Sequence, residues 1–160
     1  MRRVAALSGI GAVAFVLGIV FLWPARRSGP EPIVYGRDAC AQCRMHLSQP
    51  GFGGEMRDAR GTLTKYDDVG CLLRAILEKR TQIPEAWVED HESGRLVPLL
   101  TAHLVRTGRS TTPMGSGIVA FADEAGAREF ARTAGGEPVE LEELVRDPAR
   151  LAREDGLEDR

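Results

Sequence analysis

Residues 55–77 read EMRDARGTLTKYDDVGCLLRAIL, and this stretch decides the fold. Two short runs with the composition of strands flank Arg60-Gly61, a pair that is typical of a hairpin turn. Asp67 or Asp68 then caps a helix whose residues 71–77 place their apolar side chains on one face. The segment AWVED over 86–90 predicts a third strand. The order of the elements is therefore strand, strand, helix, strand.

The same order recurs later in the chain. Strand candidates lie at 96–99, 102–106, 118–121 and 138–141. Asp123 caps a predicted helix that ends at Ala134, because Gly135-Gly136 follows. The sequence thus predicts one small α+β domain over residues 33–145, made of two ββαβ-like halves without visible sequence identity.

Residues 4–23 form an uncharged apolar run between Arg2-Arg3 and Arg26-Arg27. A helix of roughly 20 apolar residues spans a bilayer, whereas the apolar core of a signal peptide is shorter. A buried helix of the core would show a polar face. We therefore expect a basic flank at 1–3, an uncleaved transmembrane helix at 4–23 and a proline-rich linker at 24–32, with the folded domain exported from the cytoplasm.

Composition excludes several functions. The chain carries 21 basic and 23 acidic residues and is 6% aromatic, so neither a basic patch nor a set of stacking rings favours nucleic acid as a partner. Motifs of serine hydrolases, phosphate loops and metalloproteases are missing from the sequence, which predicts that the protein is not an enzyme. Charged residues and a proline predict a disordered tail over 146–160.

Residues 40–46 read CAQCRMH and contain the densest set of metal-binding side chains. Thiolate and thioether sulfur are soft donors that favour Cu(I). Met114 stands between Pro113 and Gly115, at a corner where its side chain can project, and offers a sulfur from elsewhere in the chain. His46 is the nearest nitrogen donor, while His91 falls in a tight turn over 90–94 and is expected to be exposed.

Cys40 and Cys43 also allow interpretations without a metal. A structural disulfide suits an oxidising compartment, and a C-x-x-C pair suits a thiol–disulfide oxidoreductase. Redox pairs normally open a helix, however, and the residues after Cys43 are a poor helix start. Cys71 falls on the apolar face of the predicted helix and is interpreted as a small buried hydrophobe. The three cysteines and a histidine could supply four ligands to a structural zinc ion. Their spacing does not, however, contain the second closely spaced pair of ligands that matches the first in such sites.

Four ordered motifs resemble the NosL family, the copper chaperones that assist nitrous oxide reductase in denitrification. They are CAQCRM at 40–45, YDDVG at 66–70, WVEDHESG at 87–94 and PMGSGIVAF at 113–121. The resemblance implies a monomeric Cu(I) carrier in the periplasm or at the cell exterior. It places the ligands at Cys43, Met45 and Met114, with Cys40 as a further candidate. It also implies transfer of Cu(I) to the apo-enzyme or its maturation machinery.

The chain departs from the pattern of this family at two places. Arg44 replaces the usual glycine between cysteine and methionine, and its charge favours the Cys43 thiolate but repels Cu(I). The lipidated N-terminal cysteine common in the family is also missing, and the apolar run at 4–23 would replace that anchor. Neither departure removes a sulfur ligand.

Overall fold

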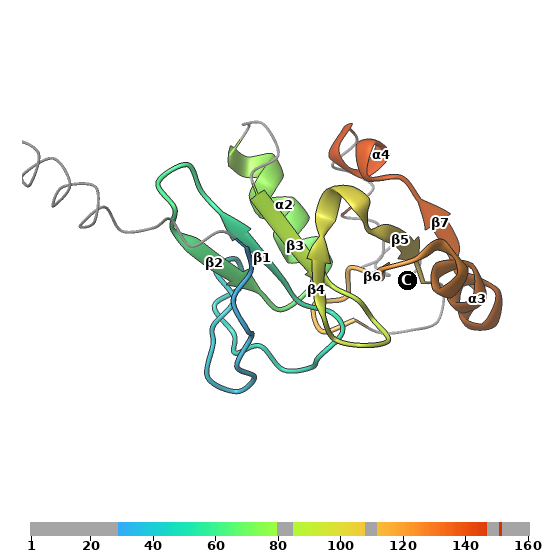
Figure 1. The fold of residues 1–160 in the computed structure, drawn as a ribbon, viewed down its shortest axis with the longest axis horizontal. Coiled ribbons are helices and arrows are strands. Elements are labelled where there is room, and N and C mark those ends of the chain that lie inside the picture. The colour runs from blue at the N-terminus through green and yellow to red at the C-terminus, as the bar shows by residue number, and fades with distance from the viewer. Residues whose placement is uncertain (1–28, 80–84, 108–111, 147–150, 152–160) are drawn as a thin grey trace, which may run out of the picture.

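A computed structural model describes residues 29–79, 85–107, 112–146 and 151 (Figure 1). Within these residues, no helix has both the length and the apolar character needed to cross a membrane. The predicted anchor at 4–23 and its basic flank at 1–3 lie outside the described residues.

The first sheet has four antiparallel strands in the order β2-β1-β3-β4 (Figure 1). These strands are β1 (Gly54–Arg57), β2 (Leu63–Tyr66), β3 (Glu85–Glu89) and β4 (Leu96–Pro98), and the 3-10 turn η1 (Leu99–Thr101) follows them. The Asp58 carboxylate holds the β1–β2 turn, because it accepts hydrogen bonds from the N–H groups of Arg60 and Thr62. Helix α2 (Val69–Lys79) joins β2 to β3 and buries its apolar face against the main core.

The second sheet has three antiparallel strands in the order β6-β5-β7. They are β5 (His103–Arg106), β6 (Ile118–Phe121) and β7 (Glu137–Val139), with α3 (Glu124–Ala134) between β6 and β7. Asp123 caps α3 by accepting from the N–H of Gly126 at 2.9 Å, and Gly135 ends it in the left-handed conformation at φ 68°. Both boundaries match the predicted helix.

The predicted α+β fold is confirmed, and both sheets have the same connectivity. In each, the first strand is central, the second lies on one side, and the strand after the helix lies on the other. The C-terminal strand is shorter than the predicted 138–141. Leu141 instead begins α4 (Leu141–Arg146), which lets Leu141 and Leu144 enter the main core. Leu151, in the predicted tail, is also buried and accepts a hydrogen bond from Arg74 through its carbonyl.

Strand β6 is buried on both faces. Ile118 and Ala120 belong to the main core, whereas Val119 and Phe121 belong to a smaller core beneath α3. Successive residues of a strand point to opposite faces, so this strand separates the two cores. A single parallel bridge between Asp90 and Ala120 connects it to the end of β3.

The expectation that His91 is exposed is wrong. Its ring is half-buried and lies edge-on to three phenylalanine rings at centroid distances of 4.8 Å (Phe52), 5.7 Å (Phe121) and 5.0 Å (Phe130). The turn that carries His91 is bonded to β6 through the hydrogen bond from His91 N–H to the Ala120 carbonyl. That bond brings the imidazole over the smaller core.

Candidate metal centre

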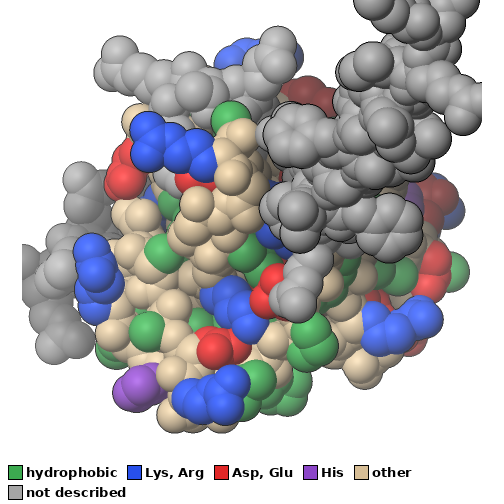
Figure 2. Space-filling model, turned by 60° about the vertical axis from the view of Figure 1, so that its left-hand side comes forward, with side chains coloured by type: hydrophobic (Ala, Val, Ile, Leu, Met, Phe, Trp, Pro, Cys, Tyr) green, Lys and Arg blue, Asp and Glu red, His purple; other side chains and the backbone are tan. Residues whose placement is uncertain are grey.

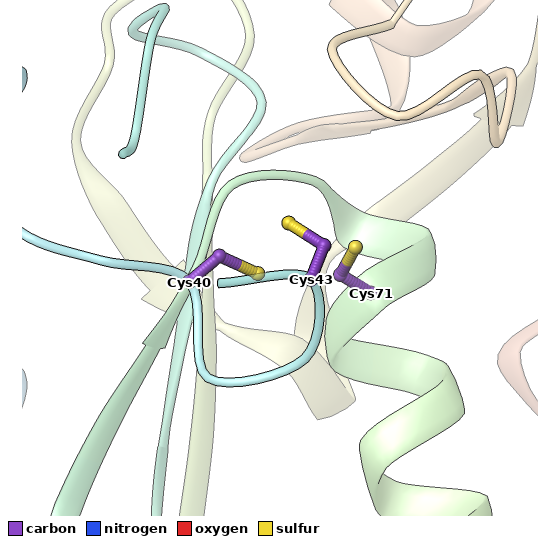
Figure 3. A group of neighbouring side chains, drawn as sticks. All are labelled: Cys40, Cys43 and Cys71. Atoms are coloured by element: carbon purple, nitrogen blue, oxygen red, sulfur yellow. The ribbon is translucent and has the colours of Figure 1, made fainter. Parts of the chain in front are cut away.

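Three cysteine sulfurs meet at the start of α2. The Sγ atoms of Cys40, Cys43 and Cys71 all lie within 4.8 Å of one another, and all three residues are free thiols. Figure 3 shows Cys40 and Cys43 on the loop before β1 and Cys71 in the first turn of α2. Cys40 and Cys71 are buried and Cys43 is half-buried. Solvent therefore reaches the cluster on the side of Cys43.

The loop that carries Cys40 and Cys43 is a tight hairpin. The N–H of Cys40 donates to the carbonyl of Met45 at 2.8 Å, and the N–H of Arg44 donates to the carbonyl of Cys40 at 2.9 Å. Arg44 has φ 69° and is the only non-glycine residue with positive φ among the described residues. This conformation costs an L-residue roughly 1–2 kcal/mol and costs glycine little. A glycine at this position would adopt the same backbone conformation without that cost.

Strand β2 and the residues after it hold the loop in place. The carbonyl of Lys65 accepts from the N–H of Ala41 at 2.9 Å, and Oδ1 of Asp67 accepts from the N–H of Ser48 at 2.7 Å. Nζ of Lys65 also donates to Oδ2 of Asp38 at 2.7 Å. Both ends of the loop are thus fixed to the segment that leads into α2.

Hydrogen bonding lowers the pKa of Cys40 below those of the other two cysteines of the cluster. Donation from the Cys71 thiol, and then from the backbone N–H groups of Cys43 and Asp67, lowers the pKa of Cys40 to about 4 despite its burial. The bond to Cys40, together with burial, raises the pKa of Cys71 well above its usual range. Burial and the neighbouring Cys40 also raise the pKa of Cys43. Cys40 is thus the most acidic of the three thiols.

Met114 lies beside the same helix start. Its backbone N–H donates to Oδ2 of Asp68 at 3.1 Å, and Oδ1 of Asp68 accepts from the N–H of Gly70 at 2.6 Å. A Cβ atom at Gly70 would lie 2.3 Å from the Cβ of Ser116, so the corner that carries Met114 touches α2 closely. The half-buried side chain of Met114 packs against the main core, as does that of Cys43.

Comparison with known proteins decides the family. A family model described as NosL matches residues 33–149. This chain belongs to the NosL family.

The fold of this NosL-family chain is also that of a solved copper chaperone. The crystal structure of the copper chaperone NosL from Shewanella denitrificans matches with a TM-score of 0.63 and 20% sequence identity, covering 73% of this chain and 96% of that one. At this identity the match shows the fold alone. No curated protein sequence matches the chain significantly.

The predicted ligands of this NosL-family chain occupy different environments. Cys40 and Cys43 lie together, and Met114 is hydrogen-bonded beside α2. Met45 is 49% exposed, and His46 is exposed next to it. The group of three cysteines contains no histidine or carboxylate within the same mutual distance, as far as the described residues extend.

Sequence reasoning missed Cys71 as a member of this cluster. Its spacing fits the buried face of α2, and it is indeed buried, but its sulfur lies among the other two. The available signal was that Cys71 stands three residues after Asp68, in the first turn of a capped helix. Asp68 caps α2 as predicted, whereas Asp67 holds Ser48 of the cysteine loop.

Three soft sulfur donors limit which metal the cluster suits. Cu(I) accepts soft ligands, whereas a structural zinc site needs four closed ligands in a tetrahedron. The arrangement therefore fits a soft monovalent ion with two or three sulfur ligands.

Proposed function

We propose that this protein is a membrane-anchored, extracytoplasmic carrier of Cu(I) that passes its cargo on by ligand exchange. The observation that carries the proposal is the gathering of three free cysteine sulfurs within 4.8 Å, two of them buried and one half-exposed. Such a site can hold a soft cation and still offer it on one side. Membership in the NosL family supports copper as the cargo.

The proposed ligands are Cys43, Met45 and Met114, with Cys40 beside them and His46 as a nitrogen donor nearby. Met45 is exposed and Cys43 is half-exposed, so a donor of an acceptor protein can approach from their side. It displaces one sulfur at a time, and the released thiolate takes up a proton from water. A weakly coordinating thioether at the rim makes this exchange easier than a closed set of thiolates would.

The proposed acceptor is the apo-form of nitrous oxide reductase or the machinery that assembles its copper centre. We further propose that residues 4–23 anchor the chain and keep the domain in the periplasm or at the cell exterior. A monomer is sufficient, since every donor comes from one chain. Figure 2 shows basic and acidic side chains interspersed on one face, which agrees with a protein partner better than with nucleic acid.

The alternative of a thiol–disulfide oxidoreductase fits the geometry less well. Such enzymes expose the cysteine with the lowered pKa, because its thiolate attacks the substrate disulfide. Here Cys40 has the lowered pKa and is 0% exposed, while the more accessible Cys43 has a raised pKa. The reactive thiolate is turned inward, which favours a role as ligand.

Titration of the reduced full-length chain with Cu(I), in mild detergent and against a chromogenic chelator, tests the proposal. We expect tight one-to-one binding, weakened at least about tenfold by Cys43→Ser and by Met114→Ala. Met56→Leu, which alters a methionine of the core, serves as the matched control and should bind as the parent does. Absence of binding would rule the carrier out, and binding indifferent to Cys43 or to Met114 would rule out the proposed site.

A further inference from the structure

We infer that Cys71 is a metal ligand. Cys40, Cys43 and Cys71 then form a site of three thiolates that holds Cu(I) on the buried side of Met45 and Met114. The inference rests on the proposed function, because it assigns a further donor to the same cargo. It differs from that function in placing the resident ion at the buried end of the cluster.

The distances suit a shared ion. A metal–sulfur bond is roughly 2.3 Å, so three sulfurs around one ion in a plane stand about 4 Å apart. The three Sγ atoms already lie within 4.8 Å of one another. Closing the site requires side-chain shifts of less than about an ångström, which rotation about χ1 supplies without moving the backbone.

The two elements that carry the donors are bonded directly to each other. Nε2 of Gln42, between the two loop cysteines, donates to Oε1 of Glu78 on α2 at 2.8 Å. The N–H of Ala41 is held by the carbonyl of Lys65 on β2. These bonds hold the loop beside the helix that supplies Cys71 and so help to bring the three sulfurs together.

Packing alone does not explain the direction of the Cys71 side chain. A cysteine that serves as a small hydrophobe needs no sulfur neighbour, and Ala75 occupies the same buried face one turn later without one. The Cys71 sulfur instead lies within 4.8 Å of the Cys40 and Cys43 sulfurs. Three sulfurs gathered around one point are the arrangement that a shared soft cation requires.

The donor count also makes the position selective. Three thiolates without a fourth ligand suit trigonal Cu(I) and leave a tetrahedral divalent ion incomplete. Met45 and Met114 remain the proposed ligands on the open side of the cluster, where they hold the ion together with Cys43 during exchange.

Cys71→Ser in the full-length chain tests the inference, with Ala75→Ser as the matched control. Both variants place a hydroxyl on the buried face of α2, but only the first removes a sulfur from the cluster. Anaerobic Cu(I) competition gives the affinity, and X-ray absorption at the copper edge counts the sulfur neighbours. We expect Cys71→Ser to weaken binding at least about tenfold and to lose one sulfur neighbour, while Ala75→Ser keeps both values.

Circular dichroism shows whether Cys71→Ser keeps the fold. If the serine disturbs the fold, Cys71→Ala replaces it in the same test. Unchanged affinity and an unchanged sulfur count in the Cys71 variants would overturn the inference and leave the carrier intact. Failure of the parent chain itself to bind Cu(I) would overturn both.

Discussion

Asp68 accepts a hydrogen bond of 3.1 Å from the backbone N–H of Met114, although 46 residues separate them in the chain. The same carboxylate, which is 0% exposed, also caps α2 through Gly70. One side chain thus fixes the methionine corner to the helix that carries Cys71. Its removal should disturb both the fold and the proposed site.

Asp68→Ala should lower the free energy of unfolding by about 2–3 kcal/mol, because two buried N–H groups lose their acceptor. Urea denaturation measures this loss. The matched control is Asp123→Ala, which removes the exposed cap of α3 and should cost only about 1 kcal/mol. Cu(I) affinity should fall in Asp68→Ala and stay unchanged in Asp123→Ala. Equal losses of stability in the two variants would contradict the bridging role of Asp68.

Arg44→Gly should raise the free energy of unfolding by about 0.5–1 kcal/mol, since it relieves the positive φ of the cysteine loop. Arg44→Ala removes the same charge but keeps a Cβ atom, so it should bring no such gain. The midpoint of urea denaturation distinguishes the two. A gain of equal size in Arg44→Ala would attribute the effect to charge and disprove the backbone explanation.

Gly70→Ala should destabilise the fold by about 1–3 kcal/mol, because the added methyl group would overlap Ser116. Ser116→Gly removes the overlapping atoms, so the double variant should recover part of the loss. Thermal unfolding of the two single variants and the double variant measures this coupling. Strictly additive losses would show that α2 and the methionine corner do not touch as described.

The free energy of unfolding should fall at acid pH, partly because the Asp38 carboxylate becomes protonated. The hydrogen bond from Lys65 lowers the pKa of Asp38 below its usual range. A lowered pKa stabilises the folded state above the unfolded value of about 3.9, and this contribution is lost as the pH falls through the folded value. Asp38→Asn should therefore flatten the decline in stability below about pH 4. Glu142→Gln, on the exposed surface of α4, is the control, and an identical flattening there would refute the assignment.

Local signals predicted the fold well, and tertiary contacts account for what they missed. The hairpin, the Asp123 cap and the Gly135 stop depend on a few neighbouring residues, so the sequence contains them in full. The buried position of Cys71 follows from helical periodicity. Periodicity cannot tell a cysteine that fills space from one that faces two other sulfurs, because that depends on where the loop at 40–46 folds.

The same limit applies to His91 and Asp67. A tight turn normally exposes its side chains, but this turn is bonded to β6 and sets the imidazole among three phenylalanine rings. From the sequence, either of the two adjacent aspartates could cap the helix that follows. Only one of them caps, and the other holds Ser48 of the cysteine loop. In both cases the partner lies far away in the sequence.

The backbone bridge between the two halves of the fold has a consequence for how copper loading can be followed. The cysteine cluster belongs to the first half, Met114 enters the second just before β6, and the His91 N–H bond to Ala120 is the backbone link between them. With copper held by Cys43 and Met114 as proposed, the ion adds a further link between the halves, beside the backbone bridge and the hydrogen bond from Met114 to Asp68. Deuterium uptake at the His91 amide would then record loading from a distance, slow when the carrier is full and faster once its copper has been handed over.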